Sequence, residues 1–577
     1  MVGPARANKL SLLMLAGFAV LFLNLVRMQI LKGDYYRSLS ERNRVRVVHL
    51  EAARGQILDR NQAPLATSRL SYNCSVIPIE AKSRIKQSCK ILGPILKMDA
   101  GELENRFRKK KPGVYNTVLM AEDITPSQAI AIEERLDFLP GFLIETRPLR
   151  EYPYAESTAH LLGYTGPMTE EEIESLEFYG YRRADWLGRE GVERTYESYL
   201  RGHSGGLQME VNNRGRFVRA LGVKEPKEGK DIQLTVDAKL QSFIQGRLKD
   251  EKGAVIVMEL GEGGILAINS APSFDSNLFS STKGRREVGR FLHDGRSPMV
   301  NRGIRGQYPA GSIFKIVTAL AALDRQKISS AAAFQCPGYS LIGGKLFHCW
   351  KEAGHGPQSL SEAFAHSCNV YFYTAGLLAG ADAIYGKAVE FGFTRMSGVD
   401  LPGEKMGFVP SREWKEKAYG QPWYDGETAN LAIGQGYLQT TPIQELLMIA
   451  AAATEGQIFK PHVIDKIEGV KVAERHARPM AISPGYWKAV KSGLQEVVNS
   501  ESGTGRLARV SGLRIAGKTG TAQSGQNKTH AWFVGYAPED NPKVAMVVFL
   551  EHGGRGGVAA AGLAGSVFKW LKDAAYV

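Results

Sequence analysis

The stretch YPAGSIFK at residues 308–315 runs directly into the apolar segment IVTALAAL at residues 316–323, and the rest of the chain is organised around it. A proline and a glycine in the first half predict a turn, and the helix formers that follow predict a helix buried on most sides. On such a helix Ser312 and Lys315 are three residues apart, so a hydroxyl and an amine share one face near the N-terminus. A hydroxyl becomes nucleophilic when a base takes its proton, and a lysine among apolar residues loses its preference for the charged form. The stretch therefore predicts a serine nucleophile for acyl chemistry.

Two short downstream elements are needed to support this prediction, because Ser-x-x-Lys alone is a weak signal. The same spacing recurs from Ser83 to Lys86 without the turn or the apolar helix. The first downstream element is Ser-Cys-Asn at residues 367–369, in a long helical region, and the second is Lys-Thr-Gly-Thr at residues 518–521, after an expected strand. The order of the three elements is the signature of penicillin-binding proteins and class A β-lactamases.

Each of these elements suits one part of such chemistry. Ser367 and Asn369 can relay a proton and hold a substrate amide, and Cys368 would face the opposite way if the triplet is locally extended. A lysine on a strand edge, Lys518, supplies a cation for a carboxylate. Gly520 lets a substrate backbone approach and pair with that edge. The backbone N–H groups of Ser312 and Thr521 would form the oxyanion hole.

The N-terminus predicts a membrane anchor. Residues 10–26 carry no charge, and Arg6 and Lys9 precede them. We expect a tail at residues 1–9 and an uncleaved anchor at residues 10–30, because Arg27 and other polar residues stand where a signal peptide would need a small-x-small cleavage site. The basic side stays in the cytoplasm, so the rest of the chain lies outside.

The length and the net charge of the chain limit the number of domains and the classes of binding partner that we expect. A chain of 577 residues predicts roughly three or four folding units. The net charge of +14 suits a membrane surface, anionic substrates or nucleic acid, but no recognition-module signature is present, so no nucleic acid is expected.

The expected fold class is multidomain α+β. Residues 31–228 read as a non-catalytic module, with a strand at 72–77, helices at 81–96 and 126–136, and a structural ion-pair and turn element at 54–61. Residues 229–577 read as a helix at 237–248, a hairpin at 253–270, later helices, strands at 531–536 and 544–550, and a last helix at 558–571. This order predicts an antiparallel sheet between terminal helices, with an all-helical subdomain inserted between its halves. His530 is expected in the core, with a wall of the binding cleft as the alternative.

The five cysteines cannot form a complete disulfide framework, because their number is odd. Three of them form a Cys-x12-Cys-x5-His-x12-Cys pattern, which is what a closed tetrahedral zinc site needs. The ligands would be Cys336, Cys349, His355 and Cys368. The alternative is a disulfide between the first two of these cysteines with the third buried. Cys74 and Cys89 are expected to pack as small apolar residues, with a disulfide between them as the alternative.

The chain resembles the class B penicillin-binding proteins over nearly its whole length. RGQILDRN at 54–61, and GVE at 191–193 with LRG at 200–202, resemble two motifs of the family's pedestal. APSFD at 271–275 and AIGQG at 432–436 resemble segments of its transpeptidase domain. The resemblance implies a transmembrane helix, an elongated α+β pedestal of the dimerisation type with a head subdomain, and a penicillin-binding transpeptidase domain.

The resemblance also implies an activity and residue roles. Ser312 would be acylated by the terminal D-Ala-D-Ala of a peptidoglycan stem peptide, or by a β-lactam, with Lys315 as general base. Ser367 would relay protons, Asn369 would hold the substrate amide, and Lys518 and Thr519 would bind the donor carboxylate. The implied enzyme is a serine-type D,D-transpeptidase of cell elongation. A division-specific class B transpeptidase and a β-lactam-binding sensor are the alternatives.

Cofactor, partners and location follow from the same resemblance. Elongation-type members, penicillin-binding protein 2, carry a structural zinc site beside the Ser-x-Asn motif, and His348 is an alternative ligand here. The expected partners are a SEDS-type glycosyltransferase and elongation scaffold proteins. The expected location is the bacterial cytoplasmic membrane, with a single span and the catalytic domain outside.

Overall fold

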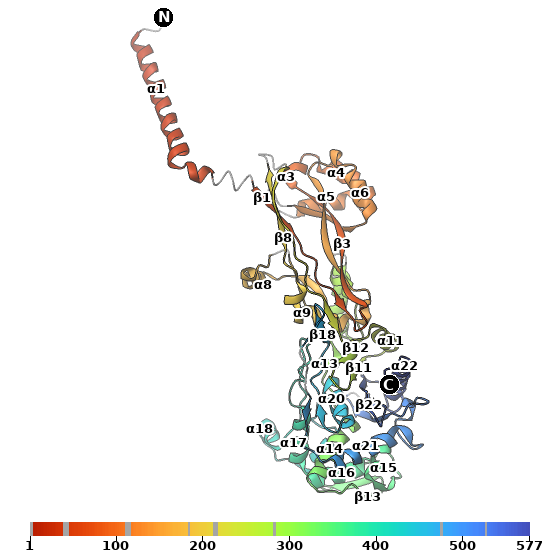
Figure 1. Ribbon diagram of the computed structural model, residues 1–577. Helices are drawn as coiled ribbons and strands as arrows, with labels where there is room; N and C mark the ends of the chain where they lie inside the picture. The colour runs from red at the N-terminus through yellow and green to blue at the C-terminus, as the bar shows by residue number, and fades with distance from the viewer. Residues whose placement is uncertain are drawn as a thin grey trace. The chain divides into compact units, whose positions relative to one another are not determined.

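The computed structural model describes residues 4–37, 45–109, 117–182, 185–211, 217–280, 284–472, 477–525 and 528–577 (Figure 1). The chain forms two compact units, each built from three separate segments. The first unit comprises Met1–Ala53, Leu70–Pro148 and Arg201–Gly229, and the second comprises Arg54–Arg69, Leu149–Leu200 and Lys230–Val577. The predicted pedestal at 31–228 thus contributes to both units. The first residues of the predicted tail, 1–3, lie outside the described residues.

The N-terminal helix has the length and composition of a membrane span. Helix α1 (Pro4–Val26) continues into the π-helical turn η1 (Arg27–Leu31). Within them, Ser11–Leu31 covers 21 residues with a mean hydropathy of 1.9, and none of it is buried against the rest of the protein. This helix fits the predicted anchor at residues 10–30.

The first unit contains a three-stranded antiparallel sheet and a small mixed core. The sheet has the order β1 (Val45–Leu50), β8 (Gly205–Val211), β9 (Phe217–Lys224). The core lies between the end of β3 (Pro64–Val76) with β4 (Val118–Ile124) and β5 (Phe142–Glu151), and the helices α3 (Pro78–Ala81), α4 (Ile85–Leu96), α5 (Ala100–Lys109) and α6 (Pro126–Glu133). The predicted helix at 81–96 is split between α3 and α4, and the one at 126–136 ends at Glu133 before the 3-10 turn η2 (Leu136–Phe138).

Cys74 and Cys89 belong to this core and are free thiols. Cys74 is fully buried and Cys89 is 1% exposed. Burial raises the pKa of the Cys74 thiol to about 12 and that of the Cys89 thiol to about 11. The two cysteines therefore pack as small apolar residues, and the disulfide alternative is wrong.

A five-stranded antiparallel sheet forms the centre of the second unit. Its order is β12 (Ile265–Ala271), β11 (Gly253–Glu259), β23 (Val544–Leu550), β22 (Thr529–Ala537), β21 (Ala516–Gln523). Every residue of β23 is buried, which requires cover on both faces of the sheet. Helices α11 (Ala238–Leu248) and α22 (Ala559–Asp573) pack on the sheet and against each other, and α20 (Pro442–Ala453) packs on β23, β11 and β22. The predicted hairpin, final strands and terminal helices are confirmed.

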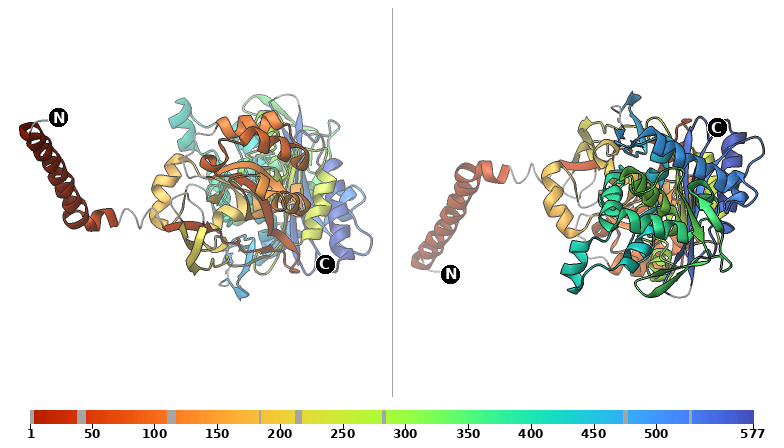
Figure 2. Two further views of the ribbon diagram at one scale, coloured as in Figure 1. Left: turned by 90° about the horizontal axis from the view of Figure 1, so that it is seen from above. Right: turned by 90° about the horizontal axis from the view of Figure 1, so that it is seen from below.

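The subdomain between β12 and β21 is mainly helical. Its helices are α14 (Lys315–Asp324), α15 (Leu360–Ala365), α16 (Asn369–Ala379), α17 (Ala381–Phe391), α19 (Asp425–Ala432) and α21 (Pro484–Asn499). The apolar segment 316–323 lies in α14, which is entirely buried apart from its last residue and packs on α16, α17 and α21. Two small antiparallel pairs accompany the helices, β13 (Ala333–Cys336) with β16 (Gly356–Ser359) and β14 (Tyr339–Ile342) with β15 (Lys345–His348). The subdomain is therefore not all-helical as predicted, because strands of four residues are too short for a periodic pattern to identify. Figure 2 shows the green segments of this subdomain together in the view from below.

Shorter elements complete the second unit. A small sheet joins β2 (Ile57–Leu58) in parallel to β10 (Ile232–Leu234), with β18 (Ile464–Ile467) and β19 (Val470–Lys471) beyond it and the start of β3 on the other side. Others are η3 (Ala155–Ser157), α7 (Ala159–Leu162), β6 (Thr165–Pro167), α8 (Glu170–Leu176), η4 (Glu177–Tyr179), β7 (Trp186–Gly188), α9 (Gly191–Thr195), α10 (Glu197–Leu200), η5 (Ser276–Phe279), α12 (Arg285–His293), α13 (Arg302–Arg305), η7 (Gly311–Phe314), α18 (Arg412–Tyr419), β17 (Gln457–Ile458), β20 (Arg478–Pro479) and η8 (Arg506–Ala508).

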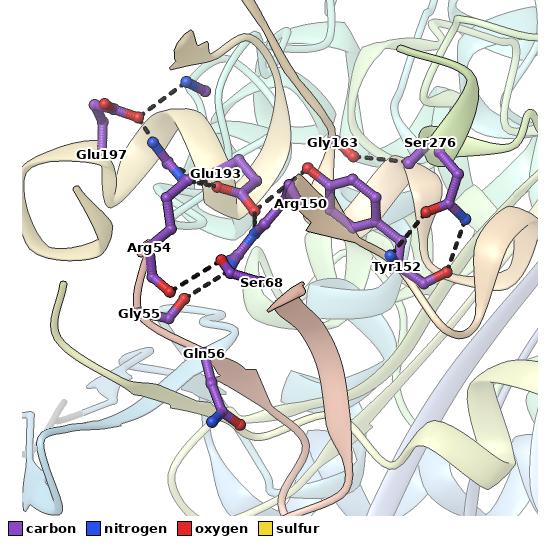
Figure 3. A network of polar contacts seen from close by, with 12 residues as sticks. Arg54, Gly55, Gln56, Ser68, Arg150, Tyr152, Gly163, Glu193, Glu197 and Ser276 are labelled. Carbon is purple, nitrogen blue, oxygen red and sulfur yellow. Dashed lines mark hydrogen bonds and ion pairs between the residues drawn. The ribbon is translucent and has the colours of Figure 1, made fainter. Parts of the chain in front are cut away.

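A buried ion-pair network connects two of the three segments of the second unit, Arg54–Arg69 and Leu149–Leu200 (Figure 3). Arg54 binds Glu193 and Glu197, each at 2.7 Å, and Arg150 binds the other oxygen of Glu193 at 2.6 Å. Glu193 is fully buried. Burial opposes its ionisation, but the charges of Arg150 and Arg54 outweigh burial and lower the pKa of its carboxyl. The predicted ion-pair element at 54–61 is confirmed, and its acceptor lies in the second pedestal motif.

Candidate active site and metal centre

The serine turn is a 3-10 turn, η7, that feeds α14. The helix thus begins at Lys315, three residues later than the sequence predicts. Gly311 is the first residue of this 3-10 turn. Its φ is +60°, and a Cβ at this position would lie 3.0 Å from the carbonyl oxygen of Thr521, so both the conformation and the space favour glycine. The half-buried Ser312 is thereby held beside β21.

Lys315 is fully buried and connects the serine turn to the Ser-x-Asn element. Its Nζ donates to the carbonyl oxygen of Ser367 at 2.9 Å and to Asn369 Oδ1 at 2.8 Å, and it lies 3.2 Å from Ser367 Oγ. Burial lowers the pKa of the Lys315 amine to about 8. A substantial fraction of this amine is therefore neutral near pH 8 and able to accept a proton.

The Ser-Cys-Asn triplet lies at the junction of α15 and α16 rather than inside a helix. Ser367 has a φ of +51°, a conformation that residues other than glycine adopt rarely. Cys368 is extended and precedes the first turn of α16. The side chains of Ser367 and Asn369 meet Lys315, and the Cys368 thiol points to other partners. Ser367 and Asn369 thus face away from Cys368, as predicted. The left-handed conformation of Ser367 produces this arrangement, whereas the prediction assumed that the whole triplet is extended.

Lys518 approaches the same serine from the edge strand β21. Its Nζ donates to Ser367 Oγ at 2.9 Å, and the side chain is fully buried. Burial, together with the nearby charge of Lys315, lowers the pKa of the Lys518 amine well below its ordinary value. Ser367 Oγ therefore stands between two amines, an arrangement that can pass a proton from one to the other.

The rest of β21 contacts the serine turn and two glycine-rich loops. A Cβ at Gly520 would lie 3.1 Å from the carbonyl oxygen of Ala310, so this glycine allows β21 to pack on the serine turn, a role that the sequence did not predict. Thr519 Oγ1 donates to Thr504 Oγ1 at 2.9 Å, and Thr521 Oγ1 accepts from the Gly556 backbone at 3.2 Å. Sequence reasoning missed Thr504, although its neighbours on both sides are glycines.

His530 belongs to the core, as expected. It is 6% exposed, and its ring lies 5.5 Å from those of Tyr308 and Phe549 and 5.0 Å from that of His552.

The predicted zinc ligands come together from four segments. The ligand atoms of Cys336, Cys349, His355 and Cys368 all lie within 4.8 Å of one another. His355 Nδ1 lies 3.6 Å from Cys336 Sγ and 3.5 Å from Cys349 Sγ. A tetrahedron with zinc–sulfur bonds of ~2.3 Å and zinc–nitrogen bonds of ~2.0 Å has sulfur–nitrogen edges of ~3.5 Å, so the donor set fits the metal. All five cysteines are free, so the disulfide alternative is wrong here too. His348 is exposed and outside the cluster.

The cluster contacts the Ser-Cys-Asn triplet directly. The backbone N–H of Asn369 donates to Cys349 Sγ at 3.4 Å. Asn369 Nδ2 donates to the carbonyl oxygen of His348 at 3.5 Å, and so does the Tyr373 hydroxyl at 3.2 Å. The cysteine segment therefore supports Asn369 through both its backbone and its side chain.

Known proteins with the same domains match most of the chain. Residues 253–569 match the penicillin binding protein transpeptidase domain, and residues 49–234 match the penicillin-binding protein dimerisation domain. Peptidoglycan D,D-transpeptidase MrdA of Haemophilus influenzae is 34% identical over 97% of this chain and 90% of that protein. MrdA of Escherichia coli K12 is 32% identical over 95% of this chain and 90% of that protein.

Two solved structures are also similar. PBP2 in the complex of PBP2 and MreC from Helicobacter pylori has a TM-score of 0.82 at 28% identity, covering 92% of this chain and 99% of that chain. Pseudomonas aeruginosa PBP2 in complex with WCK 5153 has a TM-score of 0.70 at 31% identity, covering 91% of this chain and 97% of that chain.

Proposed function

This chain belongs to the penicillin-binding proteins that combine a transpeptidase domain with a dimerisation domain, and from that membership we propose how its residues carry out D,D-transpeptidation. It is a peptidoglycan D,D-transpeptidase of the elongation type, in line with its MrdA and PBP2 relatives. This identity is favoured over a division-specific transpeptidase and over a β-lactam sensor.

Acylation begins at Ser312. Its hydroxyl oxygen attacks the carbonyl carbon between the two terminal D-alanines of the donor stem peptide, and its proton passes to the neutral amine of Lys315. The C–N bond then breaks, and the released D-alanine takes a proton on its nitrogen from the relay of Lys315, Ser367 and Lys518. An amine of a neighbouring stem peptide attacks the resulting ester, forms the new amide and restores the serine hydroxyl. The observation that carries this proposal is the approach of both lysine Nζ atoms to Ser367 Oγ, at 3.2 and 2.9 Å.

Other residues hold the substrate in this scheme. Asn369 holds the donor amide, and Lys518 with Thr519 binds the terminal carboxylate. Gly520 and Thr521 offer the β21 backbone as a partner for the donor peptide, and the N–H groups of Ser312 and Thr521 stabilise the oxyanion. Thr504 positions Thr519 through the 2.9 Å bond between their hydroxyls.

The cysteine cluster is proposed to bind one structural zinc ion. Three thiolates and one imidazole leave no open coordination position, so the ion supplies rigidity and takes no part in the chemistry. Zinc measured by mass spectrometry in the purified chain should approach one ion per protein and be lost in Cys336→Ser. Cys74→Ser is the matched control, because Cys74 is also a buried free thiol. A metal-free wild-type chain that acylates normally would contradict the proposal.

Location and partners complete the proposed function. The apolar helix anchors the chain in the bacterial cytoplasmic membrane, with its basic N-terminus inside and the catalytic domain outside. PBP2 of Helicobacter pylori forms a complex with MreC, and a further similar structure is that of a peptidoglycan synthase complex. By analogy, this chain binds an elongation scaffold protein and a SEDS-type glycan polymerase.

Labelling with a fluorescent penicillin tests the acylation scheme. Intact mass of the full-length chain in detergent should increase by one penicillin, and Ser312→Ala should abolish the increase. Ser83→Ala is the matched control, because Ser83 begins the other Ser-x-x-Lys sequence, at residues 83–86, and this variant should be labelled like the wild type. Undiminished labelling of Ser312→Ala would refute the assignment of the nucleophile.

A further inference from the structure

The hairpin of β14 and β15 has one exposed and largely apolar face. Tyr339 pairs with His348, and Leu341 pairs with Leu346. Directly opposite residues of an antiparallel pair point to the same face, so these four side chains form one surface, which we call the hairpin face. Tyr339 is 49% exposed, Leu341 68% and Leu346 55%, and His348 is also exposed.

The hairpin does not need these side chains for its own fold. Ile342, on the opposite face, is 5% exposed, and Phe347, which pairs with Ser340 on that same face, packs with its ring 5.7 Å from that of Tyr373. The hairpin is thus fixed to the domain through its inner face. Apolar side chains that are contiguous and exposed mark a binding surface more often than isolated ones do.

The hairpin face adjoins Asn369 of the candidate active site. It ends at His348, whose carbonyl oxygen accepts hydrogen bonds from the Asn369 amide and the Tyr373 hydroxyl. Two residues further on, Trp350 is 59% exposed, and its Nε1 donates to the carbonyl oxygen of His366, the residue before Ser367. The hairpin and Trp350 thus lie directly beside the Ser-Cys-Asn triplet.

We propose that the hairpin face binds the glycan strand of the polymeric substrate, next to the stem peptide that enters the cleft. The inference rests on the proposed function, because it assumes that the substrate is a peptide attached to a polymer of sugars. Only the end of the stem peptide reaches Ser312, so the sugars must lie on the protein surface near the cleft. Exposed aromatic and aliphatic side chains on one face of a strand pair suit the apolar faces of sugar rings.

A protein partner is the competing occupant, and two features favour the glycan. The hairpin adjoins Asn369 through a direct hydrogen bond to the His348 carbonyl oxygen, so a protein docked on the hairpin face would lie beside a residue proposed to hold the substrate. Lys351, which is exposed and follows Trp350 in the chain, adds positive charge next to the face, which suits the carboxylates of stem peptides carried on the same strand.

Binding of uncross-linked glycan strands to the full-length chain in detergent tests the proposal. The variant Leu341→Ser/Leu346→Ser should weaken binding about tenfold, a loss typical of truncating well-placed apolar contacts. The matched control is Val470→Ser/Met396→Ser, which removes two apolar side chains that are 71% and 58% exposed elsewhere in the same unit. The control should bind strands like the wild type.

Acylation by fluorescent penicillin separates this inference from the proposed function. The serine double variant should be labelled at a rate within about twofold of the wild type, because a small β-lactam does not reach the hairpin face. If the double variant is not labelled because the hairpin is damaged, the same binding and labelling measurements are made on Tyr339→Ser, which changes one exposed side chain.

Two results would overturn the proposal. In the first, the variant with altered hairpin face binds glycan strands as tightly as the wild type. In the second, it binds strands normally but no longer binds the glycan polymerase, which would make the face a protein-docking surface. If Ser312→Ala is still labelled, the assignment of Ser312 as the nucleophile is wrong. The binding of glycan strands to the hairpin face would then still be decided by the binding measurement alone.

Discussion

Replacement of Glu445 by glutamine should change how the stability of the second unit depends on pH. Glu445 lies in α20, every residue of which is buried. Neither carboxyl oxygen has a hydrogen-bond partner among the described residues, and burial raises the pKa of the carboxyl from 4.5 to about 8, although the nearby Thr440 hydroxyl slightly opposes this. The folded protein therefore keeps Glu445 neutral at pH 7.

The sign and size of the effect follow from these two pKa values. Below 4.5 the carboxyl is protonated in both the folded and the unfolded chain, so it contributes no pH dependence. Between 4.5 and about 8 the unfolded chain ionises while the folded chain does not, so the free energy of unfolding falls as pH rises. At ~1.4 kcal/mol for each pH unit, the total loss is up to about 5 kcal/mol. Glutamine cannot ionise, so Glu445→Gln avoids this loss and should be the more stable protein at pH 8.

Urea unfolding of the full-length chain, followed by tryptophan fluorescence, measures the difference. Trp487 and Trp532 are fully buried in the second unit and report its unfolding. The stability difference between variant and wild type should be roughly 3 to 4 kcal/mol larger at pH 8 than at pH 5. Glu416→Gln, at an exposed glutamate of α18, should show no such change. An equal difference at both pH values would refute the reasoning.

Three further predictions concern the catalytic cluster and the ion-pair network. The rate of acylation by penicillin should rise with pH through about 8, because only the neutral Lys315 amine accepts the serine proton. The variant Lys315→Arg should remove this rise. A flat wild-type profile between about pH 7 and 9 would contradict the role of Lys315 as the base. Gly311→Ala should lower stability by about 1–3 kcal/mol and slow acylation, since alanine at a φ of +60° strains the serine turn; an unchanged melting temperature and rate would contradict this. Glu193→Ala should cost about 3–5 kcal/mol in thermal unfolding because Arg54 and Arg150 lose their buried partner, whereas Glu413→Ala, in a fully exposed pair with Lys417, should leave the melting temperature unchanged.

The motifs of the catalytic cluster could be predicted because each depends on residue type and order. Ser312, Ser367 and Lys518 are far apart in the chain, and only their order relative to turns, helices and strands links them. The four proposed metal ligands could likewise be predicted from their residue types and their spacing in the chain. The resemblance to class B penicillin-binding proteins then supplied a role for each residue.

What the sequence left out depends on local backbone conformation and on tertiary contacts. Ser367 has a positive φ, which nothing in the residue type predicts. Thr504 lies in a loop and acts only through its contact with Thr519. The hairpin of β14 and β15 was missed because its strands are four residues each, shorter than a periodic pattern can identify.

The discontinuous assembly of the second unit has a practical consequence for producing this enzyme in parts. Tyr152 exchanges hydrogen bonds with Asn277 through its backbone, and Gly163 accepts one from Ser276, so the stretch 149–200 completes the start of the catalytic domain. A truncated chain that starts at residue 229 would lack this stretch and expose the apolar surface that it covers. Soluble fragments for crystallisation or inhibitor screening should therefore start upstream of Arg54 and, if shortened, should lose residues from within 70–148 rather than from the front.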